Sequence, residues 1–355
     1  RGLDRDDQPY RPRCCPGRPG RPLNPDETPA AVFLLRFDLR IPPFVEGLTP
    51  ADQYREFLEM IRWADQRGFA AVVLSEHHGT EDGYMSAPLV LAGAVLGATR
   101  NLFCSVSALL LPLQDPLRAA EDIAALDRLA PGRLKVVVGV GYRVEEFEMF
   151  GRDRSQRGRS AEEAVRVILR AWEGEPFEIE GRAIRVTPPP ASPPASLLAI
   201  GGSVEASARR AARLGLSFVP TLYDDALAEI YHTEARAQGF EGAACLMPSG
   251  PGLVLVSRDP DALWDEIGEH LLYDARLYAA WQHADQRSSW HVDAATIEDL
   301  RAGGQHAILT PGECVDLVRE TGAAVLHPLV AGIDPAIGWE TLELVVDEVM
   351  PALAG

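Results

Sequence analysis

Short runs of unbroken hydrophobic residues alternate along this chain with longer amphipathic segments. Two of these runs, Ala71–Leu74 and Phe103–Leu111, have the continuous apolar character of strands that are buried on both faces, as in a parallel sheet. Residues 119–129 instead repeat their apolar side chains at spacings of three and four, which indicates a helix. The alternation of these two patterns predicts a parallel sheet with helices outside it.

The alternation continues along the chain and predicts an α/β fold, a (β/α)8 TIM barrel formed by one domain over residues 31–355. Strands are predicted at residues 31–39, 71–75, 103–111, 134–138, 197–200, 218–220, 253–257 and 324–327. Helices are predicted at residues 50–64, 87–98, 115–129, 157–172, 204–214, 226–237, 261–281, 312–321 and 338–350. The first helix has a threonine at its expected N-cap, Thr49, followed by Pro50.

Three stretches interrupt this pattern. Residues 1–30 are rich in Arg, Pro and Gly, so we expect a disordered N-terminal extension, with a basic binding arm as the alternative. Residues 177–186 read as a small hairpin, and the proline-rich stretch after it reads as a stiff connector. Residues 282–306 are expected to form an inserted polar loop or lid.

Composition limits the classes of partner. Hydrophobic residues make up 46% of the 355 residues, enough for a large core, and the formal charge of −18 argues against a nucleic-acid or membrane partner. The five cysteines follow neither a disulfide framework nor a zinc spacing, so we expect a cytoplasmic protein without a metal site. No hydrophobic run approaches the length of a membrane-spanning helix.

Polar side chains directly follow the predicted strand at residues 71–75. Glu76, His77 and His78 come after its carboxyl end, the edge of a βα-barrel where active sites are built. Since an imidazole titrates near neutrality, His77 and His78 are candidate catalytic residues for proton transfer. Neighbouring strand residues point to opposite sides, so one of the two is expected to face a bound ring. The alternative is a polar turn with two solvated histidines.

A glycine-rich turn follows the predicted strand at residues 197–200. Gly201, Gly202 and Ser203 precede an alanine-rich helix. Glycines let the backbone approach a ligand, and a helix N-terminus offers free N–H groups. The turn is therefore a candidate phosphate site.

A second pair of glycines follows the predicted strand at residues 134–138. Gly139 and Gly141 lack the third glycine of a dinucleotide fingerprint. We expect them to bring the backbone close to a cofactor, with Tyr142 covering its ring or side chain. Packing is the alternative role for Tyr142.

The order and spacing of many short motifs resemble those of the bacterial luciferase-like family of flavin-dependent oxidoreductases. The resemblance covers most of the chain from Phe33 to Leu353. The motifs that carry it are Trp63-Ala64, Gly68-Phe69, Ser75-Glu76-His77-His78, Pro116-Leu117-Arg118, Gly132-Arg133-Leu134, Gly139-Val140-Gly141-Tyr142, Glu146-Phe147 and Phe150-Gly151.

The resemblance implies a TIM barrel with luciferase-like insertions and a monooxygenase that uses reduced FMN and oxygen on a small organic substrate. It implies that His77 faces the reactive part of the flavin as a general acid/base. It also implies a non-proline cis peptide at Ser107-Ala108, behind the isoalloxazine ring. The residues expected at the cofactor are Asp38, Glu76, Ser107, Ala108, Gly139, Gly141, Tyr142, Gly201, Gly202 and Ser203.

The resemblance leaves two other functions open. One is an oxidoreductase that transfers hydride to or from the deazaflavin F420, without oxygen. The other is a non-catalytic flavin-binding protein. Because no NAD(P)H-binding fingerprint is present, a separate flavin reductase is the expected source of reduced FMN. A homodimer is the expected assembly.

Overall fold

The computed structural model describes residues 31–282, 288 and 292–354, and the expected N-terminal extension lies outside them. The central sheet of this described part has nine parallel strands in the order β10-β9-β11-β1-β2-β3-β4-β7-β8. Its strands are β1 (Val32–Phe37), β2 (Ala71–Leu74), β3 (Phe103–Leu110), β4 (Leu134–Gly139), β7 (Leu198–Gly202), β8 (Ser217–Pro220), β9 (Leu253–Val256), β10 (His306–Leu309) and β11 (Ala323–Leu326). A separate hairpin pairs β5 (Phe177–Ile179) with β6 (Arg182–Ile184).

Strands that follow one another along the chain lie side by side from β1 to β4 and on to β7 and β8. The last strand, β11, returns to pair with β1, and β9 pairs with β11. Beyond β8, Phe218 forms a further parallel bridge with Cys245. Apart from β10, which pairs with the other side of β9, this is the βα order of the predicted TIM barrel, and the predicted fold class is confirmed.

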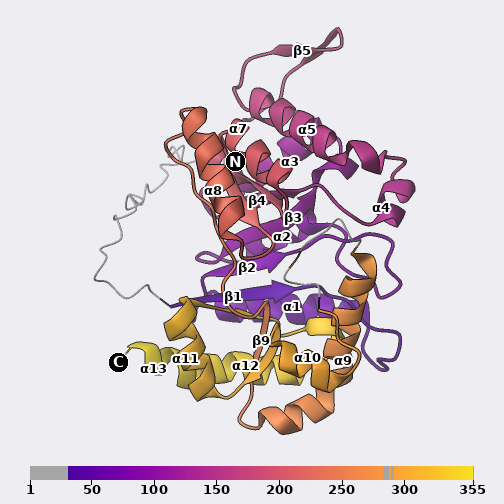
Figure 1. Ribbon diagram of the computed structural model, residues 1–355, viewed down its shortest axis with the longest axis vertical. Helices are drawn as coiled ribbons and strands as arrows, with labels where there is room; N and C mark the ends of the chain where they lie inside the picture. Colours follow the sequence, from indigo (N-terminus) through magenta and orange to yellow (C-terminus); the bar gives the residue numbers. More distant parts are fainter. Residues whose placement is uncertain (1–30, 283–287, 289–291, 355) are drawn as a thin grey trace, which may run out of the picture. The chain divides into compact units, whose positions relative to one another are not determined.

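Helices connect the strands and cover the sheet (Figure 1). They are α1 (Pro50–Ala64), α2 (Pro88–Ala98), α3 (Pro116–Leu129), α4 (Val144–Met149), α5 (Arg157–Ala171), α6 (Pro194–Leu197), α7 (Glu205–Arg213), α8 (Asp225–Ala237), α9 (Pro260–Trp281), α10 (Ile297–Gly303), α11 (Pro311–Thr321), α12 (Pro335–Leu344) and α13 (Met350–Ala354). Helix α1 begins as predicted, because Oγ1 of Thr49 accepts the N–H of Asp52 at 3.2 Å.

The prediction of a polar loop over residues 282–306 is wrong in part. Helix α10 lies within this stretch, and β10 begins at its end and pairs with β9. Most of this stretch is polar in the sequence, so the short apolar run at its end does not stand out. The strand also begins with a polar residue, His306, whose Nε2 lies 3.2 Å from Asp274 inside the protein. Residues 283–287 and 289–291 lie outside the described part.

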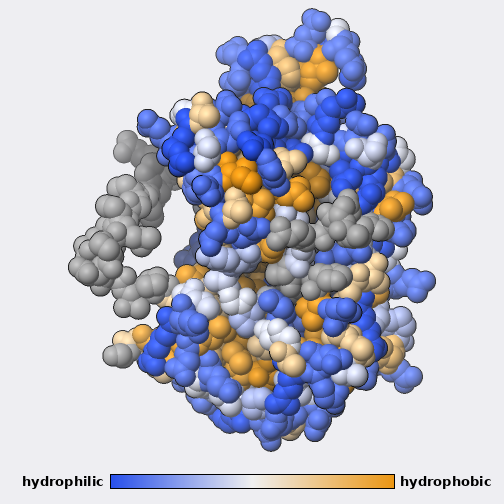
Figure 2. All heavy atoms as spheres, in the orientation of Figure 1, coloured by the Kyte–Doolittle hydropathy of each residue, from blue (hydrophilic) through white to orange (hydrophobic). Residues whose placement is uncertain are grey.

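The sheet and helices enclose a continuous apolar core, to which Leu35, Val72, Val106 and Val136 contribute from neighbouring strands. On the face shown in Figure 2, hydrophilic residues cover most of the surface, and hydrophobic residues appear between them in separate patches. None of the described helices has the length and apolar character that crossing a membrane requires.

Asp127 of α3 holds the proline-rich connector that follows the β5–β6 hairpin. Its fully buried carboxylate accepts the N–H groups of Ala191 at 2.6 Å and Ser192 at 2.7 Å, and the Ser192 hydroxyl at 2.6 Å. These charge-assisted bonds fix the path of the chain into β7. The strand that ends in the glycine turn is therefore anchored by a carboxylate on another element.

Replacing Asp127 with alanine is expected to lower the free energy of unfolding by about 2–3 kcal/mol, because two N–H groups and the Ser192 hydroxyl lose a buried carboxylate acceptor. Urea denaturation measures the change. Asp122→Ala on the same helix is the control. Its carboxylate is 34% exposed and pairs with Arg118, so it should cost about 0.5 kcal/mol or less. Equal losses in the two variants would show that the connector does not depend on Asp127.

Candidate functional site

A cavity of about 520 Å³ opens at the carboxyl ends of the strands. Its volume is within the range of small-molecule and cofactor sites. It brings together most of the residues predicted from the sequence. Those that line it are Glu76, His77, Ser107, Ala108, Gly139, Gly141, Tyr142, Gly201, Gly202 and Ser203. Other lining residues include Arg36, Ser155, Arg157, Gly158, Ser207, Arg210, Tyr278 and Gln282.

Two predicted site residues, His78 and Asp38, do not line this cavity. The side chain of His78 lies against the ring of Phe150, and its Nε2 is 2.8 Å from Oε1 of Glu76. Asp38 is buried beyond the end of β1, where its carboxylate accepts the N–H groups of Arg40 at 3.1 Å and Ala331 at 3.4 Å. Both side chains therefore interact with protein groups rather than with the cavity.

His77 is the imidazole of the cavity wall. Its Nδ1 lies 2.9 Å from Oε1 of Glu146, and its Nε2 lies 3.2 Å from the hydroxyl of Tyr142. The rings of Tyr84 and Trp281 pack against it, with centroids 4.9 and 4.8 Å away. Burial lowers the pKa of His77, and the hydrogen bond to Glu146 opposes this shift without cancelling it. The imidazole is therefore neutral near pH 7.

Glu146 on α4 is a site residue that sequence reasoning did not assign. Its buried carboxylate also accepts the N–H of His78 at 3.0 Å and lies 3.4 Å from Nη1 of Arg143. Burial raises the pKa of Glu146, but the bonds from His77 and His78 and the charge of Arg143 outweigh it, leaving the pKa below its ordinary value. Glu146 is therefore ionised. Its only sequence signal was its place in the Glu146-Phe147 motif.

Glu76 supports the end of β3. Its Oε2 accepts the N–H of Leu110 at 2.6 Å. Two residues before Leu110, the peptide between Ser107 and Ala108 is cis, as the resemblance implied. The register between β3 and β4 shifts between Ser107 and Leu109. A Cβ on Gly139 would lie 2.8 Å from Cβ of Ala108, so the close approach of the two strands requires glycine.

The glycine turn at the end of β7 lies at a positively charged end of the cavity, which is its candidate anion-binding end. A Cβ on Gly202 would lie 2.4 Å from Oγ of Ser207, and its φ of +151° also favours glycine. The turn leads into α7, whose N-terminus carries a partial positive charge. Arg157 of α5 and Arg210 of α7 line the same cavity and add full charges. Sequence reasoning missed both arginines, because nothing in their helices distinguishes them from surface cations.

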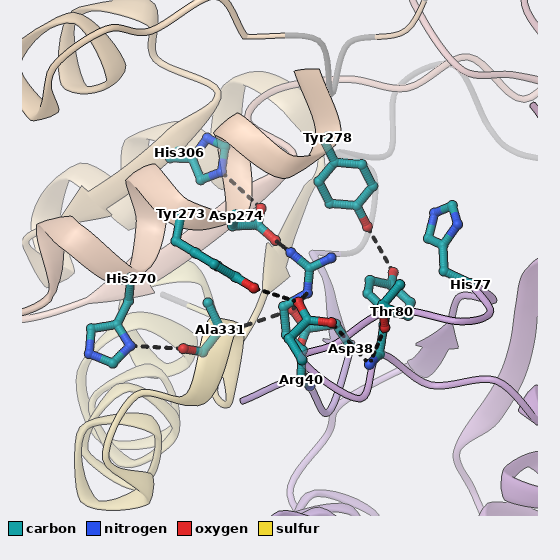
Figure 3. A network of polar contacts seen from close by, with 12 residues as sticks. Asp38, Arg40, His77, Thr80, His270, Tyr273, Asp274, Tyr278, His306 and Ala331 are labelled. Atoms are coloured by element: carbon teal, nitrogen blue, oxygen red, sulfur yellow. Dashed lines mark hydrogen bonds and ion pairs between the residues drawn. The ribbon is translucent and has the colours of Figure 1, made fainter. Parts of the chain in front are cut away.

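A buried network of charged groups lies beside the cavity (Figure 3). Arg40 is fully buried, and its guanidinium is 3.0 Å from Asp274 and 3.2 Å from Asp82. Burial raises the pKa of Asp38, and Arg40 opposes this shift. Because Asp274 belongs to α9, the network joins the end of β1 to this helix.

The same helix places Tyr278 at the cavity. The hydroxyl of Tyr278, which is labelled in Figure 3, is 2.7 Å from that of Tyr84. It also accepts a hydrogen bond from Arg36 at 3.3 Å. Arg36 itself lies on β1 and lines the cavity. Among the described residues, no group of three or more His, Cys, Asp and Glu side chains has the arrangement of a metal site.

The sequence of this chain matches one protein family. Residues 35–325 match the sequence profile described as luciferase-like monooxygenase, and the chain belongs to that family. The alkanal monooxygenase alpha chain of Photorhabdus luminescens is 34% identical over 108 residues, which are 30% of this chain. The match spans only 30% of the length of that relative.

Two solved structures share the fold. The oxygenating constituent of 3,6-diketocamphane monooxygenase from Pseudomonas putida, in complex with FMN, has a TM-score of 0.65 and 20% identity, covering 91% of this chain and 98% of that one. An F420-dependent secondary alcohol dehydrogenase has a TM-score of 0.65 and 18% identity, covering 91% and 99%. At these identities the similarity is one of fold.

Proposed function

We propose that this protein is a flavin-dependent monooxygenase that binds reduced FMN in the cavity and oxygenates a small organic substrate. The observation that carries the proposal is a single cavity lined both by an anion-binding glycine turn at Gly202 and by a buried imidazole at His77. FMN has a phosphate at one end of the molecule and a reactive ring at the other. The cavity provides groups for both parts.

The anion-binding end fits the FMN phosphate. Gly201 and Gly202 allow backbone N–H groups to approach a phosphate, and α7 begins just beyond them. Nε of Arg210 is buried without a hydrogen-bond partner among the described residues, and it lies 3.7 Å from a carboxylate oxygen of Glu162. A phosphate oxygen would satisfy this donor.

The other residues of the cavity fit the flavin ring. Ser107, Ala108, Gly139 and Gly141 form a wall without large side chains, against which an aromatic ring can lie. Bound reduced FMN would supply two electrons to oxygen, so that one oxygen atom enters the substrate and the other leaves as water. The chain's own residues orient the cofactor, exclude water and hold a proton at His77.

The deazaflavin F420 is the second candidate cofactor. It stays a candidate because the F420-dependent dehydrogenase and the FMN-binding monooxygenase share the fold of this chain equally well, both with a TM-score of 0.65. In that case hydride is transferred and oxygen takes no part. A non-catalytic flavin-binding protein is less consistent with an imidazole buried in the cavity wall beside a carboxylate.

Cofactor titration under anaerobic conditions separates these functions. We expect reduced FMN to bind at least about tenfold more tightly than reduced F420, measured by the fluorescence quenching of Trp281 and the other tryptophans. Adding labelled oxygen and a panel of aldehydes, ketones and thioethers should then give a product that carries one labelled atom by mass spectrometry. Tighter F420 binding with oxygen-independent hydride transfer would replace the monooxygenase by a dehydrogenase.

Two further parts of the proposal concern partners. A separate flavin reductase would supply reduced FMN. The reaction should therefore proceed with chemically reduced FMN and stop when only oxidised FMN and NAD(P)H are added. We also propose a homodimer, which light scattering on the purified protein tests.

A further inference from the structure

Both ring nitrogens of His77 have hydrogen-bonding partners. Nδ1 lies 2.9 Å from Oε1 of Glu146, and Nε2 lies 3.2 Å from the hydroxyl of Tyr142. Among the described residues no hydrogen bond joins His77 to Tyr84, although their rings are in contact. The contacts with Glu146 and Tyr142 therefore determine where the hydrogens of this imidazole lie.

Glu146 determines which nitrogen of the neutral imidazole carries the hydrogen. The same Oε1 accepts the backbone N–H of His78 at 3.0 Å, and an ionised carboxylate can only accept. Nδ1 of His77 must therefore donate, which leaves Nε2 as an acceptor. Tyr142 then donates its hydroxyl hydrogen to Nε2. The result is an ordered chain from Tyr142 through His77 to Glu146.

The ionisation states of the three groups agree with this direction. Burial lowers the pKa of His77 and keeps the imidazole neutral, although Glu146 opposes the shift. Burial raises the pKa of Tyr142, so its hydroxyl keeps its hydrogen. The backbone of Tyr142 is also held in place, because its carbonyl accepts a hydrogen bond from Nε of Arg154 at 2.8 Å.

Other charged and titratable groups face His77 from several elements. Arg143, beside α4, and Arg40, after β1, carry positive charges that disfavour an imidazolium. The rings of Tyr84 and Tyr278 also pack against His77, and their hydroxyls are hydrogen-bonded to each other. No second carboxylate hydrogen-bonds to His77 in the described part of the chain. A proton that arrives at His77 therefore depends on Glu146 for its stabilisation.

We propose that Tyr142 is a catalytic residue whose hydroxyl exchanges a proton with the substrate, while His77 and Glu146 form a relay behind it. This inference rests on the proposed function. When the substrate releases a proton, the proton goes to the oxygen of Tyr142 as the tyrosine's own hydrogen passes to Nε2 of His77. The imidazolium pairs with Glu146. The reverse transfer returns the proton, and no electrons move.

The hydrogen-bond order can be measured without any cofactor. In the cofactor-free protein labelled with nitrogen-15 histidine, NMR should show His77 with a protonated Nδ1 and an unprotonated, hydrogen-bonded Nε2. Tyr142→Phe should shift the Nε2 signal to that of a free acceptor, and Glu146→Gln should increase the fraction with hydrogen on Nε2. Tyr231→Phe is the control, since it removes a buried hydroxyl that donates to Leu216.

The NMR result decides the order of the chain independently of the reaction. A protonated Nε2 in the wild type, or an Nε2 signal that Tyr142→Phe leaves unchanged, would overturn the inference. Because these spectra need no flavin, they stand whether or not the protein proves to be a monooxygenase. A variant that fails to fold is recognised by its whole spectrum, and the wild-type spectrum alone still tests the order.

Turnover tests the role of the hydroxyl. Tyr142→Phe is expected to lower kcat by about 100-fold while FMN affinity stays within about threefold, because the ring remains and only the proton-carrying atom is lost. Tyr231→Phe should keep near-normal kcat. If Tyr142→Phe keeps normal turnover while His77→Ala loses it, the substrate meets His77 directly and the relay is wrong. If FMN does not bind the wild type, the proposed function fails and the NMR result remains.

Discussion

Replacing His77 with alanine is expected to lower turnover by about 100-fold or more, the scale of a lost general acid/base. The imidazole lines the cavity, and its bond to Glu146 stabilises a proton on the ring. Cofactor affinity should stay within a few-fold, because the anion-binding end lies on other strands. Steady-state kinetics and a cofactor titration measure the two effects. If F420 is the cofactor, the loss appears in anaerobic hydride transfer.

His78→Ala is the neighbouring comparison, and His232→Ala on α8 is the remote control. The side chain of His78 does not line the cavity, and it acts on the site indirectly, through Glu76, which lines the cavity and supports the end of β3. We expect a loss of about tenfold or less for His78→Ala and none for His232→Ala. A large loss confined to His78→Ala would show that the assignment is off by one residue. Normal turnover in all three would place the proton chemistry elsewhere.

The sequence predicts the barrel well because its strands are buried on both faces. Such strands are short runs of apolar residues between helices. This pattern locates the sheet strands β1 to β4, β7 to β9 and β11 to within a few residues. It does not reveal β10, whose four residues begin with a histidine. The partner that makes His306 acceptable in the interior, Asp274, lies 32 residues earlier on α9.

Residues of the candidate site could be predicted only where they lie at the carboxyl end of a strand. His77 and the glycines at the ends of β4 and β7 come directly after apolar runs. Their place at the carboxyl edge of the sheet therefore follows from the fold. Glu146 is 69 residues from His77, and its role depends on how the loop after β4 folds back. Arg157 and Arg210 lie on amphipathic helices among other arginines. A single sequence carries no signal for such contacts.

The buried network shows the same limit for charged residues. Asp38 lies at the end of a predicted strand, and the family resemblance implied a cofactor contact for it. Its environment is instead set by Arg40, whose guanidinium is held by Asp274, 234 residues further along. A buried ion pair needs partners on more than one element, and periodicity within one element does not report them. The network links β1 to α9 and thereby fixes Tyr278 at the cavity.

Replacing Gly202 with glutamate is expected to weaken FMN binding by at least about tenfold, equivalent to at least about 1.4 kcal/mol. Any Cβ at this position meets Oγ of Ser207 at 2.4 Å, and the added carboxylate would repel the phosphate that the turn is proposed to hold. Comparison with riboflavin, which lacks the phosphate, sharpens the measurement. The wild type should bind FMN more tightly than riboflavin, and the variant should lose most of this preference.

Gly312→Glu on α11 is the matched control, because a Cβ there meets nothing within 4 Å and the position lies outside the cavity lining. It should leave both affinities unchanged, which excludes an effect of net charge alone. Arg210→Gln is a second variant for the case in which Gly202→Glu fails to fold. It keeps the glycine turn and removes one cation, so it should weaken FMN binding and leave riboflavin binding nearly unchanged. Equal FMN affinity in the wild type, Gly202→Glu and Arg210→Gln would show that the phosphate lies elsewhere, because neither the shape of the turn nor its charge would then matter to the ligand.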